Sequence, residues 1–263
     1  MNQHKKENQS KKKITEEILH QIGGSVILVL LLIAVVAICM VGWLSLASKK
    51  SELIQESKAA ANQLTGFLEQ YTKSTEQLAG NPEIKSLMLE AASFGDFWQS
   101  PKMDTVMENL VNIANTDTEN VMAVWVSDLD ASPLAQSDGF KSEKGWDITG
   151  RGWYGCITEK KTVLTEPYVD SSTGKMILSA AAPVYDDATG DVLGAVGMDI
   201  SLDHMTEVMK EYKIGRNGYT LLLSEGGIFL YHPQSDIVQK NIKDTDTSQN
   251  VADAILSNNS EFL

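Results

Sequence analysis

The chain has 263 residues, of which 43% are apolar, and it carries a formal net charge of −13 at pH 7. The apolar content is sufficient for a folded core, and the negative charge argues against nucleic acid as a partner. The charge is unevenly distributed: residues 1–21 hold five lysines and three glutamates and therefore carry +2, which leaves −15 for the rest.

An uncharged apolar run of 26 residues extends from Ile22 to Ala47. As an α-helix it would span roughly 39 Å, more than the ~30 Å hydrocarbon core of a bilayer. A cleaved signal peptide is the alternative, but its apolar region needs only about 7–15 residues and a small-residue cleavage site. We therefore predict a transmembrane helix over 22–47, a cytoplasmic basic head over 1–21, and an extracellular region over 48–263. The protein is expected in the cell membrane.

The two cysteines, Cys39 and Cys156, lie on different sides of this predicted boundary. Cys39 falls inside the membrane run, so the two thiols cannot form a disulfide with each other in that topology. A lone exported cysteine argues against a disulfide scaffold. We expect Cys156 to be a small buried side chain.

Helical patterns follow the membrane run. Residues 48–80 lack proline and place apolar residues at spacings of three and four, which predicts a stalk helix continuous with the membrane helix. Asn81 and Pro82 are typical of an N-cap and first helical position, and predict a helix over 82–94. The Ser100–Pro101 pair predicts the same start for a helix over 102–116.

Strand patterns begin at residue 121. The runs 121–128, 162–170, 175–185 and 191–200 are short and rich in β-branched or apolar residues, and "SSTG" and "DDATG" supply turns between the last three. Three such runs joined by two turns predict an antiparallel meander. Ser201 is expected to cap a helix over 202–212.

A second β unit is expected from "GRNGYTLLLSEGGIFLYHP", in which "SEGG" predicts a hairpin turn, followed by a helical segment over 249–257. The predicted fold class is α+β. It comprises the transmembrane helix, the stalk, a membrane-distal module over 81–212 and the start of a membrane-proximal module over 213–263. The second module has too few strands to cover a sheet and is expected to be incomplete.

Sequence signatures of enzymes are absent. The chain has no GxSxG, no GxGxxG opening a helix, no HExxH and no P-loop. The acidic stretch "SDLDASPLAQSDG" lacks the spacing of a calcium loop. The histidines, at positions 4, 20, 204 and 232, lack ligand-like neighbours. We therefore expect no catalytic residues, no bound metal and no cofactor.

The stretch "WDITGRGWYG" concentrates three aromatic residues and an arginine in a loop, and polar residues end the later strands. An α-amino acid needs a guanidinium for its carboxylate, a carboxylate for its ammonium and an aromatic wall that excludes water. From the residues alone, the opposite interpretation is favoured: the rings belong to the core and Arg151 pairs with an acid. The candidate ligand-binding residues are Trp146, Arg151, Trp153, Tyr154, Tyr168, Asp170 and Asp199.

The ordered motifs "RGWY…EPYVDSSTGK…SAAAPVY…LGAVGMDIS" resemble the double-Cache extracellular sensor domain of bacterial chemoreceptors. The segment "GRNGYTLLLSEGGIFLYHP" resembles the start of that family's membrane-proximal module. The resemblance covers nearly all of residues 25–250. It implies two PAS-like antiparallel-sheet (Cache) modules, with the ligand in the membrane-distal one.

One group within this family recognises amino acids, and five positions here match its motif: Arg151, Trp153, Tyr154, Tyr168 and Asp199. The resemblance implies that the arginine and tryptophan hold the ligand carboxylate, while the aspartate and tyrosines hold its ammonium. Asp170 is included on its position alone. Trp146 departs from the group, which has tyrosine there. The change keeps an aromatic wall but removes a phenol oxygen, and so weakens the expectation for the amine or admits a related small amine.

The resemblance implies the sensor region of a methyl-accepting chemotaxis protein. Such a receptor acts as a homodimer, binds a small molecule and signals by a small helix displacement to cytoplasmic partners through a region outside this chain. The same domain also occurs on histidine kinases and cyclic-dinucleotide enzymes, so these outputs remain alternatives. An extracellular hydrolase anchored by its N-terminus is a third, which the missing nucleophile–base motifs disfavour.

Overall fold

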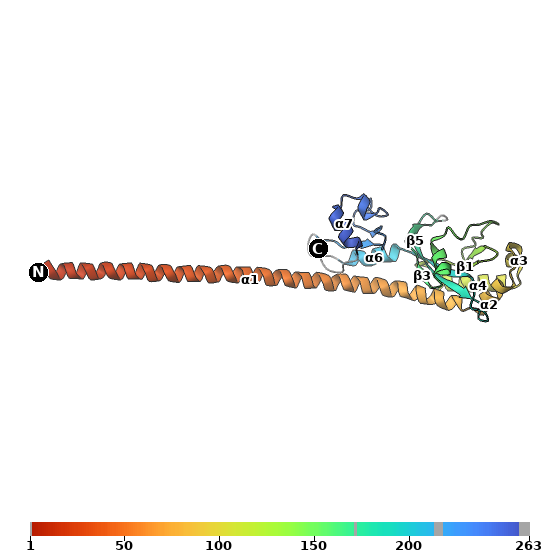
Figure 1. The fold of residues 1–263 in the computed structure, drawn as a ribbon, viewed down its shortest axis with the longest axis horizontal. Helices are drawn as coiled ribbons and strands as arrows, with labels where there is room; N and C mark the ends of the chain where they lie inside the picture. Colours follow the sequence, from red (N-terminus) through yellow and green to blue (C-terminus); the bar gives the residue numbers. More distant parts are fainter. Residues whose placement is uncertain (1, 171–172, 213–217, 258–263) are drawn as a thin grey trace. The chain divides into compact units, whose positions relative to one another are not determined.

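The computed structural model describes residues 2–170, 173–212 and 218–257, with side chains from residue 31 onward. The chain forms two units, residues 1–58 and 59–263. Figure 1 traces the elements along the chain, with the strands and the shorter helices all belonging to the second unit.

Helix α1 extends from Asn2 to Ala79 without a break. The predicted continuity between the apolar run and the stalk is therefore confirmed. In the first unit, the large apolar side chains between Leu31 and Leu46 are exposed, as in a helix suited to lipid on all sides. Among the described residues, α1 is the one helix that is long and apolar enough to cross a membrane. It ends at Ala79, and Asn81 caps the next helix.

The helices after α1 differ from the sequence prediction at two boundaries. Helix α2 is Pro82–Glu90, and Asn81 caps it as predicted by accepting from the amides of Glu83 and Ile84. The predicted helix over 82–94 was too long, because extended Ser93 caps a separate helix, α3, Phe94–Gln99. Helix α4 is Met103–Ala114.

The predicted N-cap at Ser100 was wrong. The residue before a proline favours an extended backbone, and Ser100 has ψ 135°. Its hydroxyl oxygen accepts from the Lys102 amide at 3.2 Å, which closes a turn instead of capping a helix. Helix α4 therefore begins only at Met103, after Lys102.

A six-stranded antiparallel sheet follows, with the strand order β2-β1-β6-β5-β3 and with β4 also paired to β5. The predicted meander is confirmed, but the strand expected over 162–170 is broken by Pro167, which has no N–H for the ladder. Strand β2 was not predicted. The bounds are β1 Val121–Asp128, β2 Leu134–Gln136, β3 Val163–Leu164, β4 Tyr168–Val169, β5 Met176–Tyr185 and β6 Val192–Ser201.

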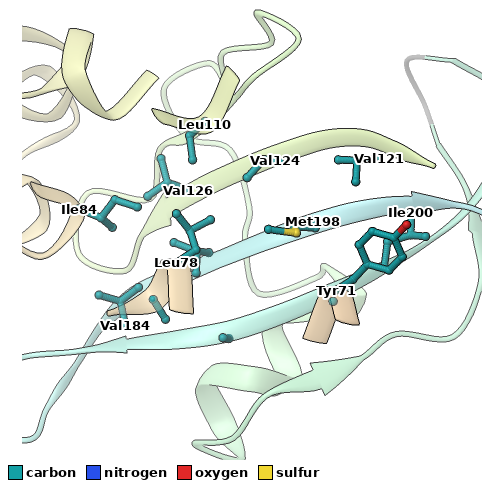
Figure 2. Packing of buried hydrophobic residues seen from close by; sticks show 14 of the residues in the cluster. Tyr71, Leu78, Ile84, Leu110, Val121, Val124, Val126, Val184, Met198 and Ile200 are labelled. Carbon is teal, nitrogen blue, oxygen red and sulfur yellow. The ribbon is translucent and has the colours of Figure 1, made fainter. Parts of the chain in front are cut away.

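The two faces of this sheet pack against different material, because successive side chains of a strand point to opposite sides. In β6, Met198 and Ile200 join the core formed with the helices, whereas Ala195 joins a second cluster on the other face. Figure 2 shows the helix face, where Tyr71 and Leu78 of α1 approach the strands. Other members of this core, also labelled there, are Ile84, Leu110, Val121, Val124, Val126 and Val184.

Helix α6, Asp203–Glu211, follows β6 directly. The predicted cap at Ser201 was wrong by one residue: Ser201 ends β6 and Leu202 is the N-cap position, although the Ser201 hydroxyl still accepts from the Asp203 amide at 3.2 Å. Helix α6 packs on α1, where the His204 ring stacks on Phe67 at a centroid distance of 4.4 Å.

Residues 218–257 form a smaller group of elements with its own core of Phe229, Ile242 and Ala252. The predicted hairpin is confirmed, with Ser224–Gly227 as its turn and the Gly227 amide donating to the Ser224 carbonyl at 3.0 Å. The predicted C-terminal helix is confirmed as well. The elements are β7 Leu222–Leu223, β8 Phe229–Tyr231, the 3₁₀ helix η2 Ile242–Asp244 and α7 Gln249–Leu256.

Candidate functional site

A cavity of about 410 Å³ lies on the face of the large sheet opposite the helices. One wall is the segment that contains Arg151 and the first residues of the short 3₁₀ helix η1 (Gly152–Tyr154), which helix α5 (Gly155–Thr158) follows directly. The floor includes Trp125 from β1 and Asp199 from β6. Its volume falls within the range of small-molecule binding sites.

The structure brings six of the seven candidate residues to this cavity: Trp146, Arg151, Trp153, Tyr168, Asp170 and Asp199. The seventh, Tyr154, is half-buried and is not among the lining residues of the described chain. Its ring lies beside Trp153, with a centroid distance of 6.5 Å. The fold thus brings six residues, spread between positions 146 and 199 of the sequence, around one cavity.

Arg151 follows closely after a turn at residues 147–149. The Asp147 carboxylate accepts from the Thr149 amide at 2.9 Å and from its hydroxyl at 2.6 Å, and these bonds hold the pKa of Asp147 below its ordinary value. The Arg151 guanidinium lies 4.0 Å from the centroid of the Trp146 ring, a cation–π contact.

The guanidinium makes no ion pair in the described part of the chain, and its Nε donates to the Asp147 carbonyl at a long 3.4 Å. The interpretation in which Arg151 closes the loop by pairing with an acid is therefore not what the structure has. A guanidinium at the wall of a cavity, with donors to spare, is suited to an incoming carboxylate.

Asp199 supplies the opposite charge on the cavity floor and is only 5% exposed. Its Oδ1 accepts from the Trp125 Nε1 at 3.0 Å and from the hydroxyl of Ser179, its register partner on β5. Burial raises the pKa of the Asp199 carboxyl to about 6, even though these two hydrogen bonds act to lower it. Near neutral pH this carboxylate is therefore ionised in a poorly hydrated place, where a ligand cation would be favoured.

Tyr168 of β4 extends this polar group. Its hydroxyl lies 2.8 Å from the Ser179 hydroxyl, and burial followed by the charge of Asp199 raises the pKa of the phenol above its ordinary value. Asp170 follows β4, and its Oδ2 accepts from the Thr173 amide at 2.8 Å and from the Thr173 hydroxyl at 2.6 Å.

Aromatic rings enclose the remaining walls. Trp125 and Trp153 lie with their ring centroids 4.7 Å apart, and Phe140 meets Trp146 edge-on at 5.4 Å. Cys156 is fully buried in the same cluster as Trp153, as predicted, and burial raises the pKa of its thiol to about 12. Rings on several sides lower the local dielectric, which strengthens charge–charge contacts inside the cavity.

Sequence reasoning missed several residues at the site. Trp125 and Ser179 contact Asp199, and four other polar or aromatic residues line the cavity: Gln136, Phe140, Thr165 and Glu166. One signal was available for Trp125, because its register partner is Gly197 and a Cβ there would overlap the indole. A glycine within a buried strand marks a place where something approaches closely.

Within the residues that the structure describes, no group of three His, Cys, Asp or Glu side chains is placed to hold a metal ion. The polar side chains that line the cavity carry one guanidinium, three carboxylates, one amide and two hydroxyls, besides the indole N–H groups. These are groups that bind organic ions by hydrogen bonds and charge.

A family model for the Cache domain, dCache_1, matches residues 45–260, and the chain belongs to this family. The methyl-accepting chemotaxis protein PscA of Pseudomonas syringae pv. tomato is 36% identical over 100 residues, which are 38% of this chain and 16% of that receptor. The chain matches 15 to 23% of the length of its curated chemotaxis relatives. The resemblance to double-Cache sensors, expected from the motifs, is confirmed.

Solved structures confirm the α+β fold class with a Cache-like antiparallel sheet. The ligand-binding domain of the Pseudomonas fluorescens chemoreceptor CtaA, in complex with L-serine, has a TM-score of 0.54 and 27% identity over 71% of this chain and 73% of that one. Complexes of CtaA with L-isoleucine, L-valine, L-leucine and L-alanine match similarly. An extracellular domain assigned to a histidine kinase, mmHK1S-Z2, has a TM-score of 0.62 at 20% identity over 80% and 83%, which shows a shared fold alone.

Proposed function

We propose that this chain is the extracellular ligand-sensing region of a transmembrane chemoreceptor, and that the cavity binds an α-amino acid. The observation that carries the proposal is the pairing of opposite poles in one cavity: a guanidinium without an ion pair on the wall, and a buried carboxylate on the floor. CtaA, which is 27% identical, is solved with several amino acids, and this supports the same ligand class here.

The roles follow from the chemistry of each pole. Arg151 and Trp153 would hold the ligand carboxylate, and Asp199 and Tyr168 would hold its ammonium. Asp170 lies at the cavity wall beyond Tyr168, and Tyr154 supports Trp153 from outside the cavity lining. Trp146 would not contact the amine as a tyrosine does in the family motif, because its face is covered by the Arg151 guanidinium.

Transmission would use α1, with the basic head in the cytoplasm and the second unit outside the cell. A ligand that binds one conformation better shifts the population by its differential affinity, about 1.4 kcal/mol for each factor of ten. The chain would act within a homodimer and reach cytoplasmic signalling partners through a region outside this sequence. Curated relatives that are chemotaxis proteins favour this output over a histidine kinase or a cyclic-dinucleotide enzyme.

The test is isothermal titration of the full chain in lipid nanodiscs against the twenty standard amino acids and a set of small amines. Arg151→Ala should weaken an amino acid about 10–100-fold, because it removes charge-assisted hydrogen bonds. Lys144→Ala, which removes a cation from the same loop but not from the cavity, should have little effect. Tight binding of small amines, equally strong in Arg151→Ala, would contradict the amino-acid assignment.

The same titration separates a sensor from an anchored hydrolase. A sensor releases its ligand unchanged, so mass spectrometry of the bound amino acid after prolonged incubation should recover it intact. Conversion of the ligand would reject the sensor assignment in favour of an enzyme.

A further inference from the structure

Ser179 lies beneath the cavity floor and is fully buried, but it is not one of the lining residues. Its hydroxyl donates to Asp199 Oδ1 and lies 2.8 Å from the hydroxyl of Tyr168. Its backbone is fixed on β5, where its amide donates to the Thr165 hydroxyl at 2.9 Å and its carbonyl accepts from the Thr165 amide at 2.9 Å. A single buried hydroxyl thus contacts both residues of the proposed ammonium pole.

The direction of these hydrogen bonds follows from counting protons. A serine hydroxyl has one proton, and Ser179 gives it to the ionised Asp199. The bond between Ser179 and Tyr168 must then be donated by Tyr168. A tyrosine also has one hydroxyl proton, so the Tyr168 oxygen can offer only a lone pair to a ligand.

The same arrangement fixes the aspartate. Oδ1 accepts from two donors, Trp125 Nε1 and the Ser179 hydroxyl, whereas no described residue donates to Oδ2. One carboxylate oxygen is therefore occupied by two donors of the protein, and the other is left for a ligand. An ammonium group has three donors and no acceptor, so it requires lone pairs of this kind.

We propose that Ser179 is a positioning residue that sets both Tyr168 and Asp199 as acceptors for the ligand's ammonium. The proposal rests on the amino-acid function proposed above and extends it to a residue that does not touch the ligand. Its role is to orient two hydrogen-bonding groups at once. A merely structural serine would affect every ligand of the cavity alike.

The proposal has a consequence for pH. Protonation of Asp199 would remove the acceptor and its charge, and so weaken ammonium binding. The titratable and charged groups around this carboxyl are Tyr168, Asp170 and Asp138, with Arg151 near Tyr168. Since the Ser179 hydrogen bond stabilises the ionised form, its loss should move the fall in affinity to higher pH.

The experiment titrates the full chain in nanodiscs with the tightest of the twenty amino acids and with the matching carboxylic acid that lacks the amine, from pH 5 to 8.5. Ser179→Ala should weaken the amino acid about 10–100-fold, leave the des-amino acid within about twofold, and raise the pH at which affinity falls. Ser179→Thr keeps the hydroxyl and should retain the wild-type pH profile. Ser127→Ala, which removes another buried strand hydroxyl that bonds the Pro133 carbonyl, is the matched control.

Equal losses for both ligands in Ser179→Ala, or an unchanged pH profile, would overturn the positioning role while leaving the amino-acid function intact. A wild-type chain that binds none of the twenty amino acids would remove both proposals together. Circular dichroism and the Ser179→Thr variant identify a loss that comes from misfolding alone.

Discussion

The two faces of the large sheet are built from the same strands but serve different purposes. On the helix face, the buried residues are almost all aliphatic or methionine, and helices α1, α2 and α4 fill the space. On the other face, tryptophans, an arginine and carboxylates line a cavity of about 410 Å³. Close packing on the helix face stabilises the fold. The cavity face is less completely packed, and this leaves room for a ligand.

This contrast shows where stability and recognition reside. A filled apolar face gains free energy from each methylene that it buries. A buried carboxylate such as Asp199 costs free energy until an opposite charge arrives. Substitutions on the two faces should therefore have effects of different kind, and the following predictions test that separation from the largest effect on stability to the smallest.

Leu110→Ala should cost about 2–5 kcal/mol of unfolding free energy, because Leu110 is fully buried on the helix face and its truncation leaves a cavity. The affinity of the remaining folded protein for its ligand should be unchanged. Chemical denaturation followed by tryptophan fluorescence measures the first effect, and titration measures the second. The control is Leu89→Ala on the neighbouring helix α2, where the leucine is 57% exposed and the cost should be small. A large loss of affinity in Leu110→Ala would show that the faces are not separate.

Gly197→Ala should cost about 1–3 kcal/mol and should also weaken ligand binding, because the added Cβ would overlap the Trp125 indole. The indole would have to leave its hydrogen bond with Asp199. Unlike the core substitution, this change should therefore affect stability and recognition together. Gly66→Ala in α1, where a Cβ would meet nothing within 4 Å, serves as the control and should not destabilise. Normal affinity in Gly197→Ala would mean that the position of Trp125 does not matter.

Asp199→Asn should stabilise the unliganded protein by roughly 1–2 kcal/mol at pH 8 while weakening amino-acid binding. The folded-state pKa of about 6 lies above the ordinary 3.8, so the folded form binds the proton more tightly than the unfolded form does. Stability from this group is therefore present below pH 4 and is lost as pH rises through 6. Melting temperatures of the two proteins from pH 4 to 8 should diverge with rising pH. A constant difference across this range would contradict the raised pKa.

The sequence was informative where structure is set by neighbours along the chain. Asn81 before Pro82 predicted a helix start that the structure has, and the turn between β5 and β6 lies where its glycine-ended "DDATG" indicated. Short elements were harder to predict. Strand β2 has only three residues, and α3 depends on a cap at Ser93 within a segment that otherwise continues a helical pattern.

In the site as well, residues close together in sequence were easier to predict than residues that meet only in the folded sheet. Arg151, Trp153 and Tyr154 lie within four consecutive positions and match a family motif, so they could be proposed before any fold was known. Ser179 and Trp125 reach Asp199 only through the pairing of β5 and β1 with β6. Strand register is a long-range property, and a serine in an alanine-rich strand gives no local sign of the carboxylate that it will meet.

Strand β6 places a restriction on how this protein can diverge. Asp199 faces the cavity, while its neighbours Met198 and Ile200 face the helices. Individual side chains of the strand can be exchanged, but a single inserted or deleted residue would turn the aliphatic pair into the cavity and drive the carboxylate into the apolar core. New ligand preferences in this lineage must therefore arise by substitution within β6 or by changes in the loops over the cavity. We do not expect insertions or deletions within β6 to be tolerated.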